Sequence, residues 1–383
     1  MTASLATLND ACEFIVDCLH ATAPTQEKGY PLIRTPNIGK GRLKLDGVYR
    51  VSEDTYDEWT RRAVPKAGDL ILAREAPAGN VAIVKEGQQV CLGQRTVHLR
   101  PDNSYVDPDF LCYYLLAPPQ QGALFAGETG ATAKHVNMKD IRRLPLKGLP
   151  HLTLQQKIGG ILSVYDDLIE NNRRRIHLLK QAARLLYKEW FVHLRFPGHE
   201  HTKIQTGIPE GWEKKQIKDV IGKVARPKKI QKADYLESGD IPCVDQSREF
   251  IGGYTDDEEA TINIGKPVVV FGDHTRILKY ISFPFACGAD GTQLIVSKDE
   301  MMSQEYLFFA LDAIDLSNYF YARHFKFLKD QYILRPSTML LSQFTDVARP
   351  IMVQIDTLRS NTERLAKARD LLLPRLMNGE VAV

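Results

Sequence analysis

Basic and amide side chains gather in the polar segments of this 383-residue chain, and their chemistry suits contact with a nucleic acid. Lys and Arg bind phosphate oxygens, while Arg reads guanine and Asn or Gln reads adenine in the major groove. The candidates in the first half are Arg34, Lys40, Arg42, Arg74, Lys134, His135 and Asn137. Those in the second half are Lys228, Lys229, Lys232, Gln246, Arg248, His274, Arg276, Arg323, His324 and Lys326. Taken singly, each is also an ordinary solvated residue, so we interpret them as groups.

Three short motifs could instead indicate that the chain is itself an enzyme, but each lacks the neighbouring residues that such a site requires. FAGETG, from Phe125, weakly resembles a cofactor-binding loop, but it does not follow the first predicted strand as such a loop would. Glu213 and Lys215 fit the end of a nuclease motif, yet no Asp precedes them back to Phe196. The histidines of HEH (199–201) lie in a polar linker, and the sequence has no G-x-x-x-x-G-K-[ST] loop. We therefore expect no catalytic residue, no metal site and no cofactor in this chain.

Composition limits the class of protein. Charged residues are 25% and hydrophobic residues 44%, as in ordinary globular proteins, and the net charge is only +3. A nucleic-acid partner would therefore require clustered rather than abundant basic residues. The six cysteines form no C-x-x-C pair, the N-terminus has no signal-like pattern, and no apolar run approaches the ~18 residues that span a bilayer. We expect a cytoplasmic protein with reduced thiols and no membrane contact.

One long helix must position the rest of the chain. Between 154 and 191, apolar residues recur at alternating steps of four and three, with no proline and one polar member. This seam consists of Ile158, Leu162, Tyr165, Ile169, Asn172, Ile176, Leu179, Ala183, Leu186 and Trp190. The pattern is typical of a helix that packs along another helix.

The partner helix is predicted at the C-terminus. Residues 350–377 begin with a proline and repeat the pattern with a shift of 189 residues, which matches Asp167 to Asp356 and Asn172 to Asn361. A polar residue in a seam fixes register, so we expect Asn172 and Asn361 to face each other as the helix-pair register. The alternative is that both lie on the solvated edge.

The segment before the long helix contains both helix-like and strand-like patterns. Residues 8–20 have helical spacing, whereas 68–75, 79–84 and 95–101 read as strands. DPDFLCYYLLA (107–117) reads as a buried helix after an Asp-Pro cap, and the polar loop 127–146 is a good place for recognition.

The second half echoes the first. KPVVVFGDHT resembles AGDLILAREA, QEYLFFALDA resembles PDFLCYYLLA, and RHFKFLKD resembles AKHVNMKD. We predict an α/β (α+β) fold of two mixed domains joined by two long antiparallel helices in a coiled coil, with a pseudo-two-fold internal repeat. The predicted boundaries are 1–153 for the first domain, 154–196 for the central helix, 197–345 for a linker and the second domain, and 346–383 for the distal helix.

The strings DDLIENNRRRIHLLKQAARLLYKEWFVHLRFPGHE and LRSNTERLAKARDLLLPRLMNGEV closely resemble the specificity subunit of type I restriction-modification enzymes. The likeness covers the whole chain in architecture, and the helical segments carry it most specifically. One departure is the entry to the central helix, which is Leu154, Gln155, Gln156 where the family usually has Glu-Glu-Gln.

The resemblance implies a non-catalytic subunit that reads double-stranded DNA. Two target recognition domains would read a bipartite site, and the helices would set the spacing, since about 38 residues at ~1.5 Å span ~57 Å against ~34 Å for a DNA turn. The implied partners are two methyltransferase subunits and, through them, the restriction subunits. S-adenosylmethionine, ATP and Mg would belong to those partners.

Apolar residues outside the seam also predict a further partner. Leu168, Leu178 and Leu185 would remain in water in a two-stranded coil, so we interpret them as a subunit interface. The family's methyltransferase helices pack there, while the alternative is contact with the chain's own domains. A stand-alone DNA methyltransferase or nuclease, and a coiled-coil protein-interaction scaffold, are the competing functions.

Overall fold

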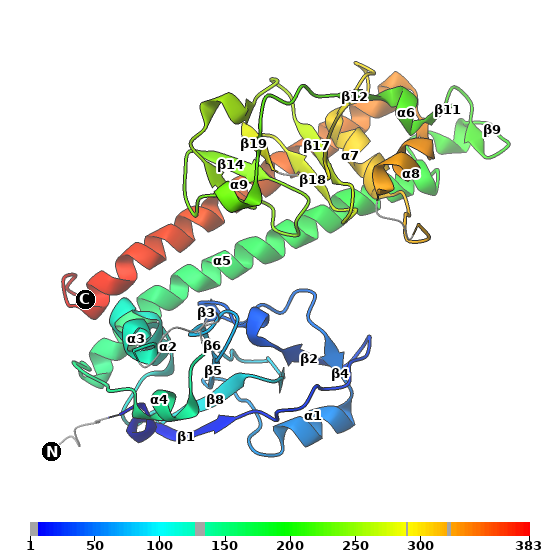
Figure 1. Ribbon diagram of the computed structural model, residues 1–383. Coiled ribbons are helices and arrows are strands. Elements are labelled where there is room, and N and C mark those ends of the chain that lie inside the picture. Colours follow the sequence, from blue (N-terminus) through cyan, green and yellow to red (C-terminus); the bar gives the residue numbers. More distant parts are fainter. Residues whose placement is uncertain (1–6, 127–134, 289, 320–322) are drawn as a thin grey trace. The chain divides into compact units, whose positions relative to one another are not determined.

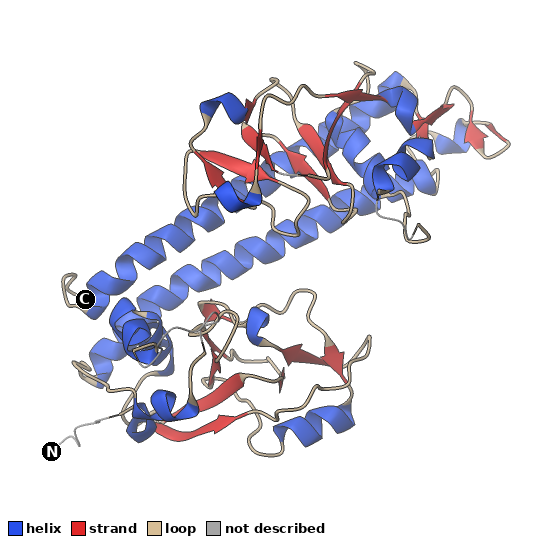
Figure 2. Ribbon diagram, in the orientation of Figure 1, coloured by secondary structure: helices blue, strands red, loops and turns tan. Residues whose placement is uncertain are grey.

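The computed structural model describes residues 7–126, 135–288, 290–319 and 323–383 (Figure 1). The chain forms two compact units: unit 1 is Met1–Asn172 with Asn361–Val383, and unit 2 is Arg173–Ser360. Each unit mixes strands with helices, as the sequence predicted (Figure 2). The two long helices, α5 (Leu152–Tyr187) and α9 (Thr338–Met377), each contribute residues to both units.

The described residues of unit 1 form two sheets. The larger has the order β1 (Cys12–Asp17), β8 (Thr96–Pro101), β5 (Leu70–Ala73), β6 (Val81–Ile83), β3 (Gly41–Arg42), and only the β3–β6 pair is parallel. The smaller has the order β4 (Arg50–Val51), β2 (Tyr30–Ile33), β7 (Cys91–Leu92). Besides its parts of α5 and α9, this unit has the α-helices α1 (Glu53–Thr60), α2 (Pro108–Leu116), α3 (Pro118–Leu124) and α4 (Met138–Arg143) among the described residues.

Unit 2 repeats this plan. Its first sheet has the antiparallel order β12 (Ile221–Lys223), β20 (Thr292–Ser297), β17 (Val268–Gly272), β18 (Leu278–Ile281). Its second has the order β13 (Lys229–Ile230), β19 (Phe285–Gly288), β14 (Ile241–Val244), β15 (Gly253–Thr255), and β16 (Thr261–Ile262) also pairs with β19. The remaining elements are β9 (Ile204–Gln205), β10 (Ile208–Pro209), β11 (Glu213–Gln216), α6 (Ile217–Val220), α7 (Gln304–Asp312), α8 (His324–Asp330) and β21 (Tyr332–Arg335).

Strand order shows that the two units share a topology. The order β1-β8-β5-β6 in unit 1 corresponds to β12-β20-β17-β18 in unit 2, and all of these neighbours are antiparallel. In the second sheet of each unit, β2 is antiparallel to β4 and parallel to β7, just as β14 is antiparallel to β15 and parallel to β19. The internal repeat predicted from the sequence is therefore confirmed.

The helix pair is antiparallel in each unit. In unit 1, Ile158 and Leu162 near the start of α5 share one core cluster with Leu373 and Leu376 near the end of α9. In unit 2, Tyr187 at the end of α5 lies against Phe344 near the start of α9, with ring centroids 6.1 Å apart. Helices whose opposite ends meet in this way must run in opposite directions.

The start of α5 is fixed to α2 by a polar contact and a glycine. The Gln155 amide donates to the carbonyl of Pro150 at 2.9 Å and accepts from the backbone N–H of Asp107 at 3.0 Å. A Cβ on Gly159 would lie 2.6 Å from the backbone nitrogen of Phe110, so only glycine permits this close approach. The unusual Leu-Gln-Gln entry thus supplies a helix-to-helix tie.

Two sequence-based predictions of local structure are wrong. Residues 8–20 do not form a helix, because Cys12–Asp17 pairs as β1 with β8 after a 3-10 turn at Leu8–Ala11. Long-range strand pairing here outweighs the helical spacing.

The second error concerns Pro350, which lies inside α9 rather than at its start. Pro350 and Asp346 are exposed, so the carbonyl that loses its helical donor can reach water. Burial of Phe344, Ala348 and Met352 in the core of unit 2 extends the helix past the proline.

A buried ion pair joins the two helices in unit 1. Asp166 of α5 is 2% exposed, and its carboxylate accepts hydrogen bonds from Arg369 of α9 and from the Tyr113 hydroxyl at 2.5 Å. Arg369 is 9% exposed and also donates to the exposed carboxylate of Asp370. Burial and the Asp166 charge raise the pKa of Tyr113, so its hydroxyl remains a donor.

We expect Asp166→Ala to lower the free energy of unfolding by about 3–5 kcal/mol, because a buried guanidinium loses its partner. Asp370→Ala removes an exposed carboxylate from the same guanidinium and should cost no more than about 1 kcal/mol. Denaturant titration of both variants measures the difference. An equal decrease in the free energy of unfolding for both variants would show that the buried partner of Arg369 stabilises the fold no more than the exposed one.

Candidate nucleic-acid interface

In unit 1, the segment before α4 is anchored to the end of the central strand β5. The backbone N–H of Val136 donates to the carbonyl of Arg74 at 2.9 Å, and Nε of Arg74 donates back to the carbonyl of Val136 at 3.0 Å. Arg74 directly follows β5, so this strand fixes the position of the residues around Val136, just before α4.

Side chains reinforce this anchor. An Arg74 guanidinium nitrogen lies 2.9 Å from Nε2 of His135, and Nδ1 of His135 lies 2.8 Å from a carboxylate oxygen of Glu75. Because guanidinium can only donate, Nε2 must accept and Nδ1 must donate to Glu75. Arg95 adds a 2.7 Å ion pair to Glu75. Arg74 and His135 are thus half-buried parts of a fixed polar network.

Unit 2 builds the matching anchor from different side chains. Asp273 follows β17, its carbonyl accepts from the backbone N–H of His324 at 2.9 Å, and its carboxylate accepts from that of Phe325 at 2.8 Å. The His324 ring is buried, with its nitrogens 2.9 and 3.0 Å from the carbonyl oxygens of Asp273 and Tyr319. The segment that begins α8 is therefore held at the corresponding place.

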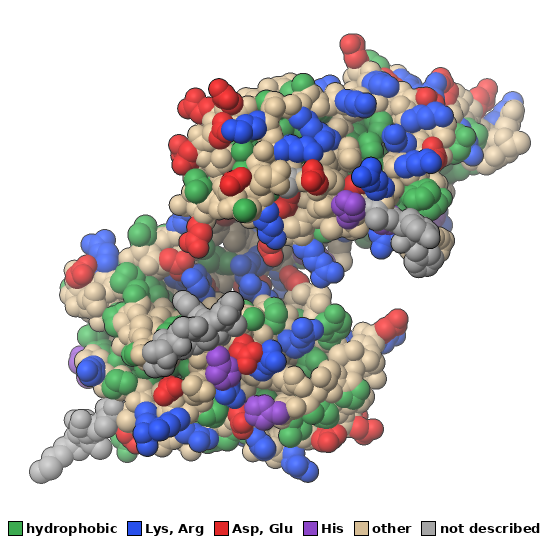
Figure 3. All heavy atoms as spheres, viewed as in Figure 1, with side chains coloured by type: hydrophobic (Ala, Val, Ile, Leu, Met, Phe, Trp, Pro, Cys, Tyr) green, Lys and Arg blue, Asp and Glu red, His purple; other side chains and the backbone are tan. Residues whose placement is uncertain are grey.

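The predicted contact residues divide by exposure. The exposed ones are Arg34, Lys40, Asn137, Lys228, Lys229, Lys232, Arg248, His274, Arg276, Arg323 and Lys326. Arg74, His135 and Gln246 are half-buried, Arg42 and His324 are buried, and Lys134 lies outside the described residues. On the face shown in Figure 3, Lys and Arg are spread over both units and interspersed with acidic side chains.

Three of these residues hold the fold together. Arg42 donates to Asp167 at 2.8 Å and to the Ser163 hydroxyl at 2.7 Å, so it fastens its loop to α5. His324 has the buried backbone contacts described above. Both amide atoms of Gln246 are engaged, with the carbonyl of Asp290 at 2.9 Å and the N–H of His274 at 3.0 Å. DNA contact by Arg42 and His324 stays a prediction, and the burial of both side chains disfavours it.

Some exposed candidates already form ion pairs with carboxylates, and a DNA phosphate could take the place of the carboxylate. Lys228 pairs with Asp257, and Lys229 pairs with Asp290 at 3.2 Å. Exposed ion pairs of this kind contribute little to stability, so a phosphate can displace the carboxylate at small cost.

A groove of about 560 Å³ in unit 1 adds residues that the sequence reading missed. Its wall includes Arg34, Tyr49, Gln94 and Arg95, and the Arg34 guanidinium lies 5.3 Å from the centre of the Tyr49 ring. A guanidinium and a ring set out in this way can stack on a base or bind a phosphate. The Gly-Gln-Arg turn between β7 and β8 was the available signal for Gln94 and Arg95.

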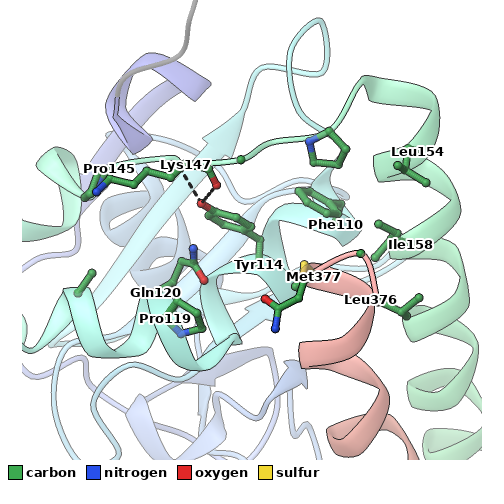
Figure 4. A pocket seen from close by; sticks show the side chains of 15 residues that line it. Phe110, Tyr114, Pro119, Gln120, Pro145, Lys147, Leu154, Ile158, Leu376 and Met377 are labelled. Carbon is green, nitrogen blue, oxygen red and sulfur yellow. Dashed lines mark hydrogen bonds between the residues drawn. The ribbon is translucent and has the colours of Figure 1, made fainter. Parts of the chain in front are cut away.

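Figure 4 shows a second cavity of about 560 Å³ in unit 1, formed where α2, α3 and the ends of α5 and α9 meet. Phe110, Leu154, Ile158 and Leu376 make it largely apolar, and Lys147 is its one charged side chain among the described residues. This lining offers no general acid or base pair.

The motifs considered for catalysis remain isolated. Within the described ranges, no group of three or more His, Cys, Asp or Glu could hold a metal ion. Glu213 pairs with Lys215, and His199 and His201 lie in a 3-10 turn. Residues 127–130 of the FAGETG motif are outside the described part. All six cysteines are free thiols.

The surface of the helices differs in how it treats the two predicted sets of residues, the exposed leucines and the Asn pair. Leu168, Leu178 and Leu185 are 46%, 52% and 60% exposed, with Ile161, Val164 and Val192 exposed at heptad-related positions of the same segment. Asn172 is half-buried and Asn361 is exposed, whereas Thr362 next to it is half-buried. The Asn172–Asn361 register pair stays a prediction, and this exposure favours the solvated-edge alternative.

No described helix is long and apolar enough to cross a membrane.

We expect Arg42→Ala to destabilise the protein by about 3 kcal/mol, because it leaves buried polar partners unsatisfied. Arg34→Ala, at an exposed position, should change the free energy of unfolding by no more than about 0.5 kcal/mol. Urea denaturation separates the two, and a neutral Arg42→Ala would contradict a structural role.

Comparison with known proteins identifies the family. A family model described as the type I restriction modification DNA specificity domain matches residues 7–181 and 209–336. The chain is 25% identical over 363 residues to the type I restriction enzyme MjaIX specificity subunit of Methanocaldococcus jannaschii, covering 88% of this chain and 83% of that protein. It is 22% identical over 422 residues to the HindI specificity subunit of Haemophilus influenzae, covering 82% and 87%.

A solved structure has the same fold. The crystal structure of a type I restriction-modification system S subunit from M. genitalium aligns with a TM-score of 0.55 at 15% identity, over 97% of this chain and 94% of that one. Since the family model matches most of both halves, this chain belongs to the type I restriction modification DNA specificity family.

Proposed function

We propose that this chain is the non-catalytic reader of a type I restriction-modification complex, and that each unit reads one block of a bipartite double-stranded DNA target. The observation that carries the proposal is the repeated strand order of the two units. Duplex DNA has local two-fold symmetry, so a duplicated reader suits two separated half-sites.

The reading surface of each unit is proposed to lie around the anchored segments that precede α4 and α8. Exposed candidates next to these anchors include Asn137, Arg323 and Lys326, while Arg34 contributes from the groove of unit 1. Fixed backbone with exposed side chains permits base reading without a large cost of ordering on binding.

The long helices are proposed to set the spacer between the two blocks. The 36 residues of α5 correspond to about 54 Å of helix, compared with ~34 Å for one turn of DNA. Because α5 passes from one unit to the other and α9 returns, the helix pair is the connection that any change of spacing must alter.

The partners are proposed to be two methyltransferase subunits, with restriction subunits joining through them. Exposed leucines on α5 form the proposed docking face, since an apolar stripe of this kind is costly to leave in water. S-adenosylmethionine, ATP and Mg are assigned to the partner subunits, where the methyl transfer and DNA cleavage would occur.

Inserting seven residues into α5 after Asn172 and seven into α9 before Asn361 adds about two turns, or ~10 Å, to each helix. We expect the unread spacer to lengthen by about three base pairs while both blocks remain unchanged. Mapping of methylated adenines in cells that also express the methyltransferase measures this. Replacing seven existing residues with Ala at the same points is the control, and altered blocks would contradict the spacing role.

Leu168→Glu with Leu178→Glu should weaken binding of the methyltransferase subunit at least about 100-fold, because two charges would be desolvated in the interface. Folding should be unaffected, since both side chains are exposed. Gln156→Glu with His177→Glu places equal charge at other exposed positions and should bind normally. Unchanged assembly of the leucine variant, measured by analytical ultracentrifugation, would remove this docking face.

A further inference from the structure

The two matching helices carry a cation at equivalent positions, and within the described part of the chain only the cation on α9 forms an ion pair. The shift of 189 residues places Lys180 of α5 over Arg369 of α9 and Asp166 over Ile355. In unit 1, Arg369 pairs with Asp166 and donates to the carbonyl of Lys40 at 3.1 Å. In unit 2, the position of the aspartate is filled by Ile355, which is fully buried.

Lys180 is therefore a cation without its built-in counterion. Its side chain is half-buried, and among the described residues its ammonium makes no hydrogen bond and no ion pair within 4.0 Å. Burial, together with the charges of Arg359 and Arg184, lowers the pKa of Lys180 to about 8. A group in this state gains from any anion that can enter beside it.

Such an anion has a place to enter. Lys180 lines a cavity of about 180 Å³ within unit 2, whose wall also includes Arg184, Arg248, Lys279 and Arg359. These five cations come from α5, α9, β18 and the loop after β14, so donors approach from several directions.

Three of the five are held by carboxylates. Arg184 pairs with Asp312 at 2.6 Å, Arg359 with Asp356 at 2.7 Å, and Lys279 lies 3.7 Å from Asp245. Arg248 is exposed and, like Lys180, has no ion pair in the described part of the chain. The cavity thus keeps two unmatched positive charges.

The rest of the wall is apolar and aromatic. The centre of the Phe250 ring lies 3.6 Å from the Arg359 guanidinium, and the other lining residues include Leu278, Phe308 and Met352. A low local dielectric strengthens an ion pair formed there.

We propose that this cavity binds a single phosphate group. Its volume admits a tetrahedral oxyanion but not a whole nucleotide, and forked guanidinium donors beside an ammonium match phosphate oxygens. The group would come either from a free or nucleotide phosphate or from the DNA backbone. The site does not depend on the function proposed above.

Titration of the full chain with sodium sulfate, at ionic strength held constant with chloride, tests the site. We expect saturable binding by calorimetry and a rise in Tm of a few degrees. Lys180→Met should weaken sulfate binding at least tenfold and Arg248→Ala less, whereas Lys157→Met on an exposed part of the same helix should bind normally. Equal binding by the wild type and Lys180→Met would overturn the proposal.

The pH dependence of stability checks the lone ammonium independently. The groups around it are Arg184 on α5, Asp312 on α7, Arg359 and Asp356 on α9, Lys279 on β18, and Arg248 with Asp245 in the loop after β14. Because the folded pKa of about 8 is below that of an unfolded lysine, the unfolded state binds more protons between them. Without sulfate, the wild type should gain stability relative to Lys180→Met as pH rises from about 8 to 10. If the stability of the wild type and of Lys180→Met changed with pH in the same way, that would count against the site.

Two further titrations identify the source of the phosphate. If the DNA backbone occupies the cavity, Lys180→Met should reduce the slope of log affinity against log salt by about one for a non-specific duplex. If a nucleotide or inorganic phosphate occupies it, the DNA slope should be unchanged and ATP or phosphate should displace sulfate. Failure of both, with no sulfate binding, would rule out the site even if DNA recognition stands.

Discussion

The antiparallel packing of α5 against α9 is the constraint on which the rest of this structure depends. The core of unit 1 includes Ile158 from one helix and Leu376 from the other, and the core of unit 2 includes Ala183 and Phe344 in the same way. Neither unit is complete with one helix. Since the partners are separated by well over a hundred residues, each unit closes only when distant segments have met.

The two units share one scaffold but differ in their polar contacts. The same helix position is a paired Arg369 in unit 1 and, among the residues that the structure describes, an unpaired Lys180 in unit 2. The end of the central strand is tied by Arg74 in one unit and by Asp273 in the other. Backbone topology is determined by burial of apolar faces, which many sequences satisfy, whereas each buried charge requires a specific partner.

This division of roles is what a modular reader needs. The anchors that hold the segments before α4 and α8 use backbone groups in both units, so they constrain the path of the chain without prescribing the exposed side chains. Residues such as Asn137 and Lys326 can then vary with little effect on the fold. The binding specificity of each unit can change while the helix pair stays the same.

The sequence by itself determined the helix pair, its repeat and the class of the two domains. Heptad spacing and the 189-residue shift are properties of side-chain order, so they predicted the buried Leu162 and Ala183 directly. The strands at 70–73 and 96–101 and the helix capped by Asp107 were also predictable from apolar runs and turn residues.

Tertiary structure alone decided the rest. Strand pairing converted the helical pattern of 12–17 into β1, and core packing carried α9 through Pro350. Arg42 and Arg34 have the same side chain, yet one is buried against α5 and the other lines an open groove. The type of a basic residue states what it can bind, but its burial and its partners, which depend on segments far away in the chain, decide whether it is free to do so.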